Sequence, residues 1–121
     1  MVNKLIQPQE VEVWYIIPLI RKELALAMKK RKMPQNEIAS LLGVTDSAIS
    51  QYSNNKRAAG LKFDLAVQKR IDLSAEKIIE EESEVTSEIQ NILKMPEMMK
   101  KICQLHKKYS NISRKCSVCL K

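Results

Sequence analysis

Four side chains able to bind a metal ion lie in the last part of the chain. They are the one histidine and all three cysteines of the sequence, in the pattern Cys-x2-His-x9-Cys-x2-Cys: Cys103, His106, Cys116 and Cys119. Cys103 and His106 are three residues apart, so on a helix they would share a face. The two-residue gap between Cys116 and Cys119 lets two thiolates bind one ion. The spacing therefore predicts a metal centre, either tetrahedral zinc or an iron–sulfur cluster.

Simpler interpretations of these residues remain open. Cys103 would serve as a small buried apolar residue, since Ile102 and Leu105 flank it. His106 would lie on the surface among neighbouring lysines. Nucleophilic catalysis by a Cys–His pair is disfavoured, because the sequence offers no evident oxyanion donors or substrate pocket. We therefore expect neither an enzyme nor a small-molecule substrate.

Composition restricts the fold class and the kind of partner. The 121 residues include only two glycines, which disfavours turn-rich β folds and predicts an all-α protein. The net charge of +7 favours a polyanionic partner, and the basic residues gather toward both ends of the chain. No apolar run reaches the roughly 20 residues of a membrane-spanning helix, and no signal peptide is recognisable. We expect a cytoplasmic protein without a membrane partner, in which structural disulfides are disfavoured.

Helical spacing and capping residues predict the elements that position these groups. In the segment 10–31, Pro18 either opens a helix, with residues 11–17 as a separate short helix or strand, or kinks one long helix. Further helices are expected at 35–42, 46–54, 62–70, 75–82, 84–94 and 97–109, with a loop at 53–60 and a turn at 110–113. Ser74 is expected to cap the helix at 75–82.

Residues 35–52, QNEIASLLGVTDSAISQY, have the pattern of two short helices joined by a tight turn. Ala39 is small where the helices would touch, Gly43 permits a left-handed backbone, and Thr45 can cap the second helix. The apolar residues are spaced to bury a shared core: Ile38, Leu42, Val44, Ala48, Ile49 and Tyr52. The side chains left outward on the second helix are short and polar, suited to the base edges of the major groove: Thr45, Asp46, Ser47, Ser50, Gln51 and Asn54.

This stretch resembles the helix-turn-helix of the Cro and phage-repressor (XRE-type) family. The resemblance spans about residues 18–82 and is specific over 35–59, with matches at Gln35, Ile38, Ala39, Gly43, Val44, Thr45, Ile49 and Ser50. It implies a five-helix domain that binds double-stranded DNA, usually as a dimer.

The resemblance also implies roles for individual residues. The base-reading positions are Thr45, Asp46, Ser47, Ser50 and Gln51. Gln35 would contact a phosphate, and the phosphate-binding loop would consist of Asn54, Asn55, Lys56 and Arg57. Asp46 departs from the family, since an acid near phosphates is unfavourable unless it accepts a hydrogen bond from a cytosine amino group or only caps the helix.

These features predict an all-α transcriptional regulator, with a Cro-like domain at 1–82 and a helical extension at 83–121. A homodimer is expected, with the apolar residues of 11–20 and of the helices after residue 84 as its interface. Trp14 and Tyr15 would anchor it, unless they only pack on the domain's own core. The metal centre of the extension would hold the tail in place or sense metal or redox state. The layout also resembles small archaeal-type regulators with a cysteine-bearing tail, which implies a redox-sensing iron–sulfur cluster with His106 as fourth ligand. The alternative is a protein- or RNA-binding module with a structural zinc site.

Overall fold

The computed structural model describes residues 7–54 and 63–109, and the secondary structure within them is entirely helical. In chain order the elements are α1 (Pro8–Val11), the π-helix η1 (Glu12–Ile16), α2 (Ile17–Lys30), α3 (Gln35–Leu42), α4 (Asp46–Asn54), α5 (Leu65–Ile79), α6 (Val85–Leu93) and α7 (Pro96–Tyr109). The all-α prediction is confirmed.

Residues 8–30 form one continuous helical run that contains Pro18. The proline lies at the start of α2, directly after the wider turn of η1, which already interrupts the regular i to i+4 hydrogen bonds of an α-helix. The backbone N–H of Ile17 donates to the carbonyl of Glu12, which is the i to i+5 hydrogen bond of a π-helix. Val11 and Ile17, the residues flanking η1, both have right-handed helical dihedrals. The strand considered for residues 11–17 is therefore wrong.

Residues 65–79 form a single helix, α5, where two helices at 62–70 and 75–82 were predicted. The predicted cap, Ser74, is instead fully buried within this helix. Its hydroxyl donates to Glu88 Oε1 over 2.5 Å, so its hydrogen-bonding capacity is used by α6 rather than by a new helix end. The prediction of a helix start at Ser74 is therefore wrong.

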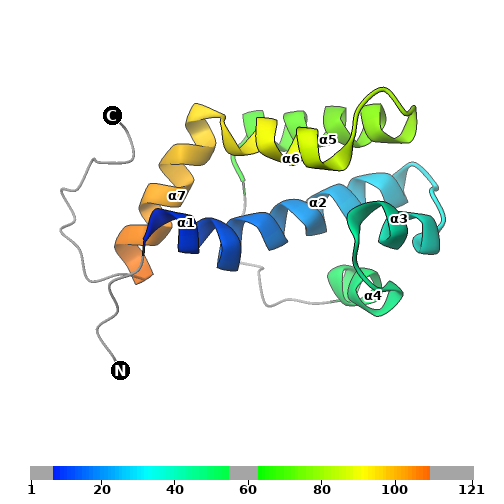
Figure 1. Ribbon diagram of the computed structural model, residues 1–121, viewed down its shortest axis with the longest axis horizontal. Helices are drawn as coiled ribbons and strands as arrows, with labels where there is room; N and C mark the ends of the chain where they lie inside the picture. The colour runs from blue at the N-terminus through cyan, green and yellow to red at the C-terminus, as the bar shows by residue number, and fades with distance from the viewer. Residues whose placement is uncertain (1–6, 55–62, 110–121) are drawn as a thin grey trace.

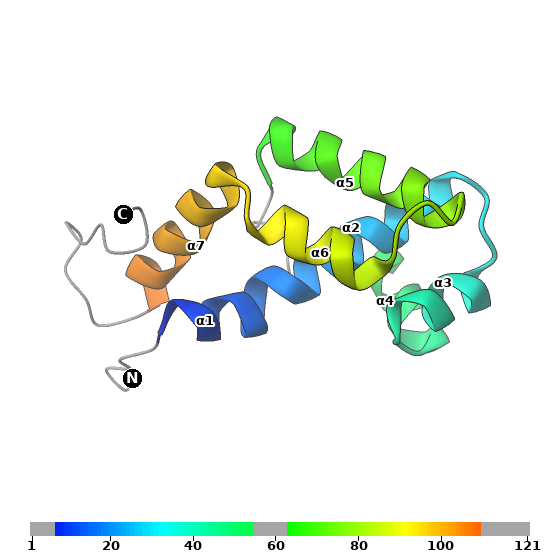
Figure 2. The ribbon, with the colours of Figure 1, turned by 45° about the horizontal axis from the view of Figure 1, so that its top comes forward.

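The long helical run passes through the middle of the molecule, and other helices pack on two sides of it. Figures 1 and 2 show α5 and α6 along one side of α2, with α3 and α4 on the other, and α7 beside α1. One cluster of buried apolar side chains runs from Val11 through Ile20 and Ile71 to Ile92 and Leu105. The division of the chain between residues 82 and 83 stays a prediction, and this cluster is continuous across it.

A buried carboxylate joins α5 to α6. Glu88 is 2% exposed and accepts hydrogen bonds from Arg70 Nη2 at 2.9 Å, Ser74 Oγ at 2.5 Å and Ser83 Oγ at 2.6 Å. Burial alone would raise the pKa of Glu88. The serine hydrogen bonds and the charges of Arg70 and Lys77 outweigh this effect, and they lower the pKa from its ordinary value of 4.5.

Candidate nucleic-acid interface

The turn between α3 and α4 is a Schellman motif built around Gly43. Gly43 has φ of +68°, its N–H donates to the Ser40 carbonyl over 3.3 Å, and the Val44 N–H donates to the Ala39 carbonyl over 3.0 Å. Apart from its two chain neighbours, no described residue has an atom within 4 Å of the position that a Cβ at residue 43 would take. Glycine is therefore needed here for its left-handed dihedral angle rather than for space, as the sequence predicted.

Thr45 caps α4, which confirms the prediction made for it. The backbone N–H of Ala48 donates to Thr45 Oγ1 over 3.1 Å. Asp46 follows as the first residue of α4, and its exposed side chain lies where the helix dipole favours a negative charge. Because Thr45 supplies the cap, capping does not account for an acid at position 46.

The inner faces of α3 and α4 meet over the predicted apolar residues. Ile38, Leu42 and Ile49 are buried, and the small Ala39 is only 5% exposed. The remaining predicted core residues are partly buried: Val44, Ala48 and Tyr52. The packing of the two helices, which fixes the direction of the outer face of α4, is therefore confirmed.

The outer face of α4 brings together the predicted base-reading side chains. All five are exposed: Thr45, Asp46, Ser47, Ser50 and Gln51. Asn54 is the last residue of α4. The rest of the predicted phosphate-binding loop, Asn55, Lys56 and Arg57, lies outside the described residues. The geometry supports one polar surface on α4, and the contacts of these residues with DNA stay a prediction.

Gln35 holds α4 against the start of α3. Its Nε2 donates to the backbone carbonyl of Asp46 over 3.0 Å and to Ser50 Oγ over 2.9 Å. The sequence interpretation assigned Gln35 only a phosphate contact and missed this link, since no local pattern pairs residues fifteen positions apart. A serine oxygen that accepts a hydrogen bond still has its own proton to donate. Ser50 therefore keeps one proton with which it can donate while it accepts from Gln35.

The comparison with protein families confirms what this geometry indicates. Residues 24–63 match the family model described as helix-turn-helix, which covers the end of α2, α3, the Gly43 turn and α4. The chain carries a helix-turn-helix of the Cro and phage-repressor type. This match supports a DNA-binding domain over these residues. No curated protein and no solved structure matches the chain.

The described residues outside this helix-turn-helix include half of the predicted metal ligands. Cys103 and His106 are 4% and 6% exposed on α7, so the surface position considered for His106 is wrong. Cys116 and Cys119 lie outside the described residues. Within residues 7–54 and 63–109, no three His, Cys, Asp or Glu side chains gather into a group that could hold a metal ion. The metal centre therefore stays a prediction.

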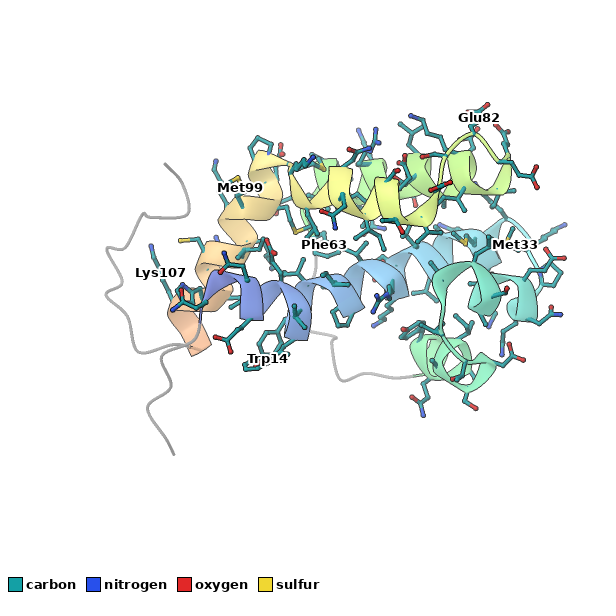
Figure 3. The ribbon with its side chains drawn as sticks, in the orientation of Figure 1. Trp14, Met33, Phe63, Glu82, Met99 and Lys107 are labelled. Carbon is teal, nitrogen blue, oxygen red and sulfur yellow. The ribbon has the colours of Figure 1, made fainter. Side chains whose placement is uncertain are left out.

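The acidic turn between α5 and α6 lies away from α4, although it shares a hollow with Leu41 of α3. Glu80, Glu81, Glu82 and Glu84 are all exposed around the turn from α5 to α6. Figure 3 shows Glu82 on the side of the molecule opposite α4. In the same two described ranges, no helix has the length and apolar character needed to cross a membrane.

Proposed function

We propose that the protein is a sequence-specific transcriptional regulator that inserts α4 into the major groove of DNA. The observation that carries this proposal is the division of α4 into two faces. Ile49 is 1% exposed against the core, whereas Ser47 and Gln51, which lie on the far side of the helix from it, are exposed to solvent, as are Thr45, Asp46 and Ser50. An α-helix fits the major groove, where each base pair presents its own pattern of donors and acceptors. The hydroxyl, amide and carboxylate groups of α4 can bind both the donors and the acceptors of base pairs.

The distribution of charge supports a phosphate-bearing partner. The chain carries a net charge of +7, and the exposed residues Lys29, Lys30, Arg31 and Lys32 follow one another at the end of α2. Electrostatic attraction to phosphates supplies most sequence-independent affinity, while base contacts supply specificity. Because Glu82 lies opposite α4, the acidic turn would stay clear of a duplex bound there (Figure 3).

The test separates base reading from phosphate binding. The operator is first selected from random duplexes with the wild-type protein. Gln51→Ala should then weaken specific binding by about 1–3 kcal/mol and relax the preference at one base pair. Lys56→Ala and Arg57→Ala should weaken binding to every sequence and reduce its dependence on salt.

Two results would contradict these assignments. One is a Gln51→Ala variant with unchanged specific affinity together with a Lys56→Ala variant that changes base preference. The other is a wild-type protein that binds unrelated duplexes equally well, which would favour the RNA- or protein-binding module instead.

We also propose that the protein binds as a homodimer and that its tail holds a metal centre. One helix-turn-helix covers a short half-site, so two copies would bind an inverted repeat whose halves are about 34–36 Å apart. For the tail, the supporting observation is that Cys103 and His106 are both buried and lie three residues apart on α7. Zinc or an iron–sulfur cluster would be completed by Cys116 and Cys119, and its loss or oxidation would change operator affinity only if the centre is a sensor.

A further inference from the structure

The first half of the long helical run has an apolar side that no described element covers. Val13 and Trp14 are 59% and 51% exposed, Pro18 is exposed, and Ile17 is only partly buried. Figure 3 shows Trp14 on the same side of the run as α4. The second half of the run lies against α3 and α4 on that side, whereas Trp14 faces solvent (Figures 1 and 3). Large apolar side chains exposed together in this way mark interaction surfaces.

Opposite charges flank this apolar surface along the helix. Glu10 precedes it and Arg21 follows it. These two and the apolar residues between them are three or four positions apart along a run that includes the wider turn of η1, and the exposure of Val13, Trp14 and Pro18 places them on the solvent side of the run. We call this set the Trp14 face: Glu10, Val13, Trp14, Ile17, Pro18 and Arg21. Arg21 forms no ion pair with any described residue, and its buried Nε has no hydrogen-bond acceptor among them.

We propose that a second copy of the chain binds the Trp14 face through its own Trp14 face, with the two helices antiparallel. From either end, the face consists of one charged residue, four apolar residues and one residue of the opposite charge. A two-fold axis passing between Tyr15 and Ile16 would place Trp14 on the second copy's Ile17, and Val13 on the second copy's Pro18. It would also place Glu10 beside the second copy's Arg21. Each contact then occurs twice, as a two-fold interface requires.

The charges favour a second copy over DNA as the occupant of this face. A phosphate backbone would meet the carboxylate of Glu10 at one end, and Arg21 would be the one cation on the face to attract it. Packing against a second copy instead pairs both charges and covers the tryptophan. The inference rests on the proposed function in one respect, namely that two half-sites require two copies, but the surface itself is independent of DNA.

The size of the face sets the expected affinity. Stable interfaces bury about 800 Å² on each partner, and six residues of one helix supply less than that. We therefore expect a micromolar dissociation constant for the free dimer and a tighter association on an operator, where two linked half-sites raise the effective concentration of the copies.

Trp14 provides the first test, because it is the one tryptophan in the chain. Across the micromolar range, sedimentation should show a change from monomer to dimer. Over the same range the tryptophan emission should move to shorter wavelength and acrylamide quenching should decrease, since the indole leaves water. A dimer whose tryptophan emission and quenching do not change with concentration would overturn the proposal, and so would a protein that stays monomeric both free and on its operator.

An exchange of charges provides the second test. Glu10→Arg alone and Arg21→Glu alone should each weaken dimerisation about tenfold, whereas the double variant should restore it to within about threefold of wild type. The matched control is Leu65→Lys, because Leu65 is 71% exposed on α5 and should leave dimerisation unchanged. Glu10 Oε1 also accepts a hydrogen bond from the Gln7 N–H over 2.8 Å, and Glu10→Arg removes it. Circular dichroism therefore checks that the variants remain folded. A folded double variant that dimerises no better than the single variants would overturn the proposed pairing.

DNA binding distinguishes a failure of this inference from a failure of the proposed function. A duplex with one half-site requires only one copy, so the double charge variant, whose net charge equals that of wild type, should bind it as well as wild type does. If the charge variants dimerise as predicted but neither they nor wild type prefer any duplex, the proposed function fails and the interface stands. If half-site binding is specific, but dimerisation is unaffected by the charge variants and leaves the Trp14 emission unchanged, the interface fails and the proposed function stands.

Discussion

Replacing Gln35 with alanine should weaken operator binding by about tenfold, although Gln35 is not one of the proposed base-reading residues. The substitution removes both hydrogen bonds from Nε2 to α4, at 3.0 Å to the Asp46 carbonyl and 2.9 Å to Ser50 Oγ. A hydrogen bond contributes about 0.5–1.5 kcal/mol net, and both of these are exposed to solvent, so each belongs near the lower end of that range. Together they amount to about 1.4 kcal/mol, which corresponds to a factor of ten in an equilibrium constant.

The assay is a double-mutant cycle on operator affinity at fixed salt. Gln35→Ala and Ser50→Ala are measured singly and together. If the Gln35 hydrogen bond positions the Ser50 hydroxyl for a base acceptor, the two changes should be coupled by about 0.5–1 kcal/mol. Asn36→Ala is the matched control, because this exposed amide neighbours Gln35 but makes no hydrogen bond to α4 within the described residues.

The salt dependence then separates positioning from a charge effect. Gln35 is neutral, so its removal should leave the slope of affinity against salt unchanged whether or not it also contacts a phosphate. Gln35→Glu should be worse than Gln35→Ala, because a carboxylate cannot donate to Ser50 and would repel the backbone of the duplex. Additive effects of Gln35→Ala and Ser50→Ala, with coupling no larger than that of Asn36→Ala, would refute the positioning role.

Two further predictions concern the core and the tail. Glu88→Ala should lower the free energy of unfolding at neutral pH by about 3 kcal/mol, measured by urea denaturation, because it leaves Arg70 and two hydroxyls without their buried acceptor. Folding lowers the pKa of Glu88 below 4.5, so its contribution to the free energy of unfolding is present above pH 4.5 and is lost as the pH falls through the lowered pKa. The difference in stability between wild type and variant should therefore shrink in acid. Anaerobically purified protein should contain zinc or iron, and the Cys116→Ser/Cys119→Ser double variant should lose it; a full complement of metal in that variant would eliminate the proposed centre.

The elements that the sequence predicted correctly are those whose limits are set by local chemistry. The helix at 35–42 ends at a glycine that adopts positive φ, and the helix at 46–54 begins after a threonine that caps it. Both signals act within four residues of the helix end, so they could be recognised without the fold. The polar outer face of α4 followed from the same helical limits together with the spacing of Ile38, Leu42 and Ile49.

The errors occurred where distant partners decide the structure. Ser74 resembles a helix cap in sequence, but a carboxylate fourteen positions away takes its hydroxyl inside α5. Lys32 and Glu81, which follow the ends of α2 and α5, both have positive φ. Neither residue type predicts a left-handed turn in the way that a glycine does. The hydrogen bonds of Gln35 to α4 were missed for the same reason, since they depend on how α3 and α4 cross.

The π-helix η1 determines how much sequence variation the long helix can accept. In an uninterrupted α-helix, nine steps of about 100° would place Val11 and Ile20 on opposite sides, yet both are fully buried. The wider turn of η1 offsets part of this rotation and brings both residues to the core. A deletion of one residue within 12–16 would therefore leave a regular α-helix with both residues still facing inward. The same deletion within α2 would turn everything before it by about 100°, Trp14 included. A one-residue deletion is thus tolerated within residues 12–16 and disruptive within α2.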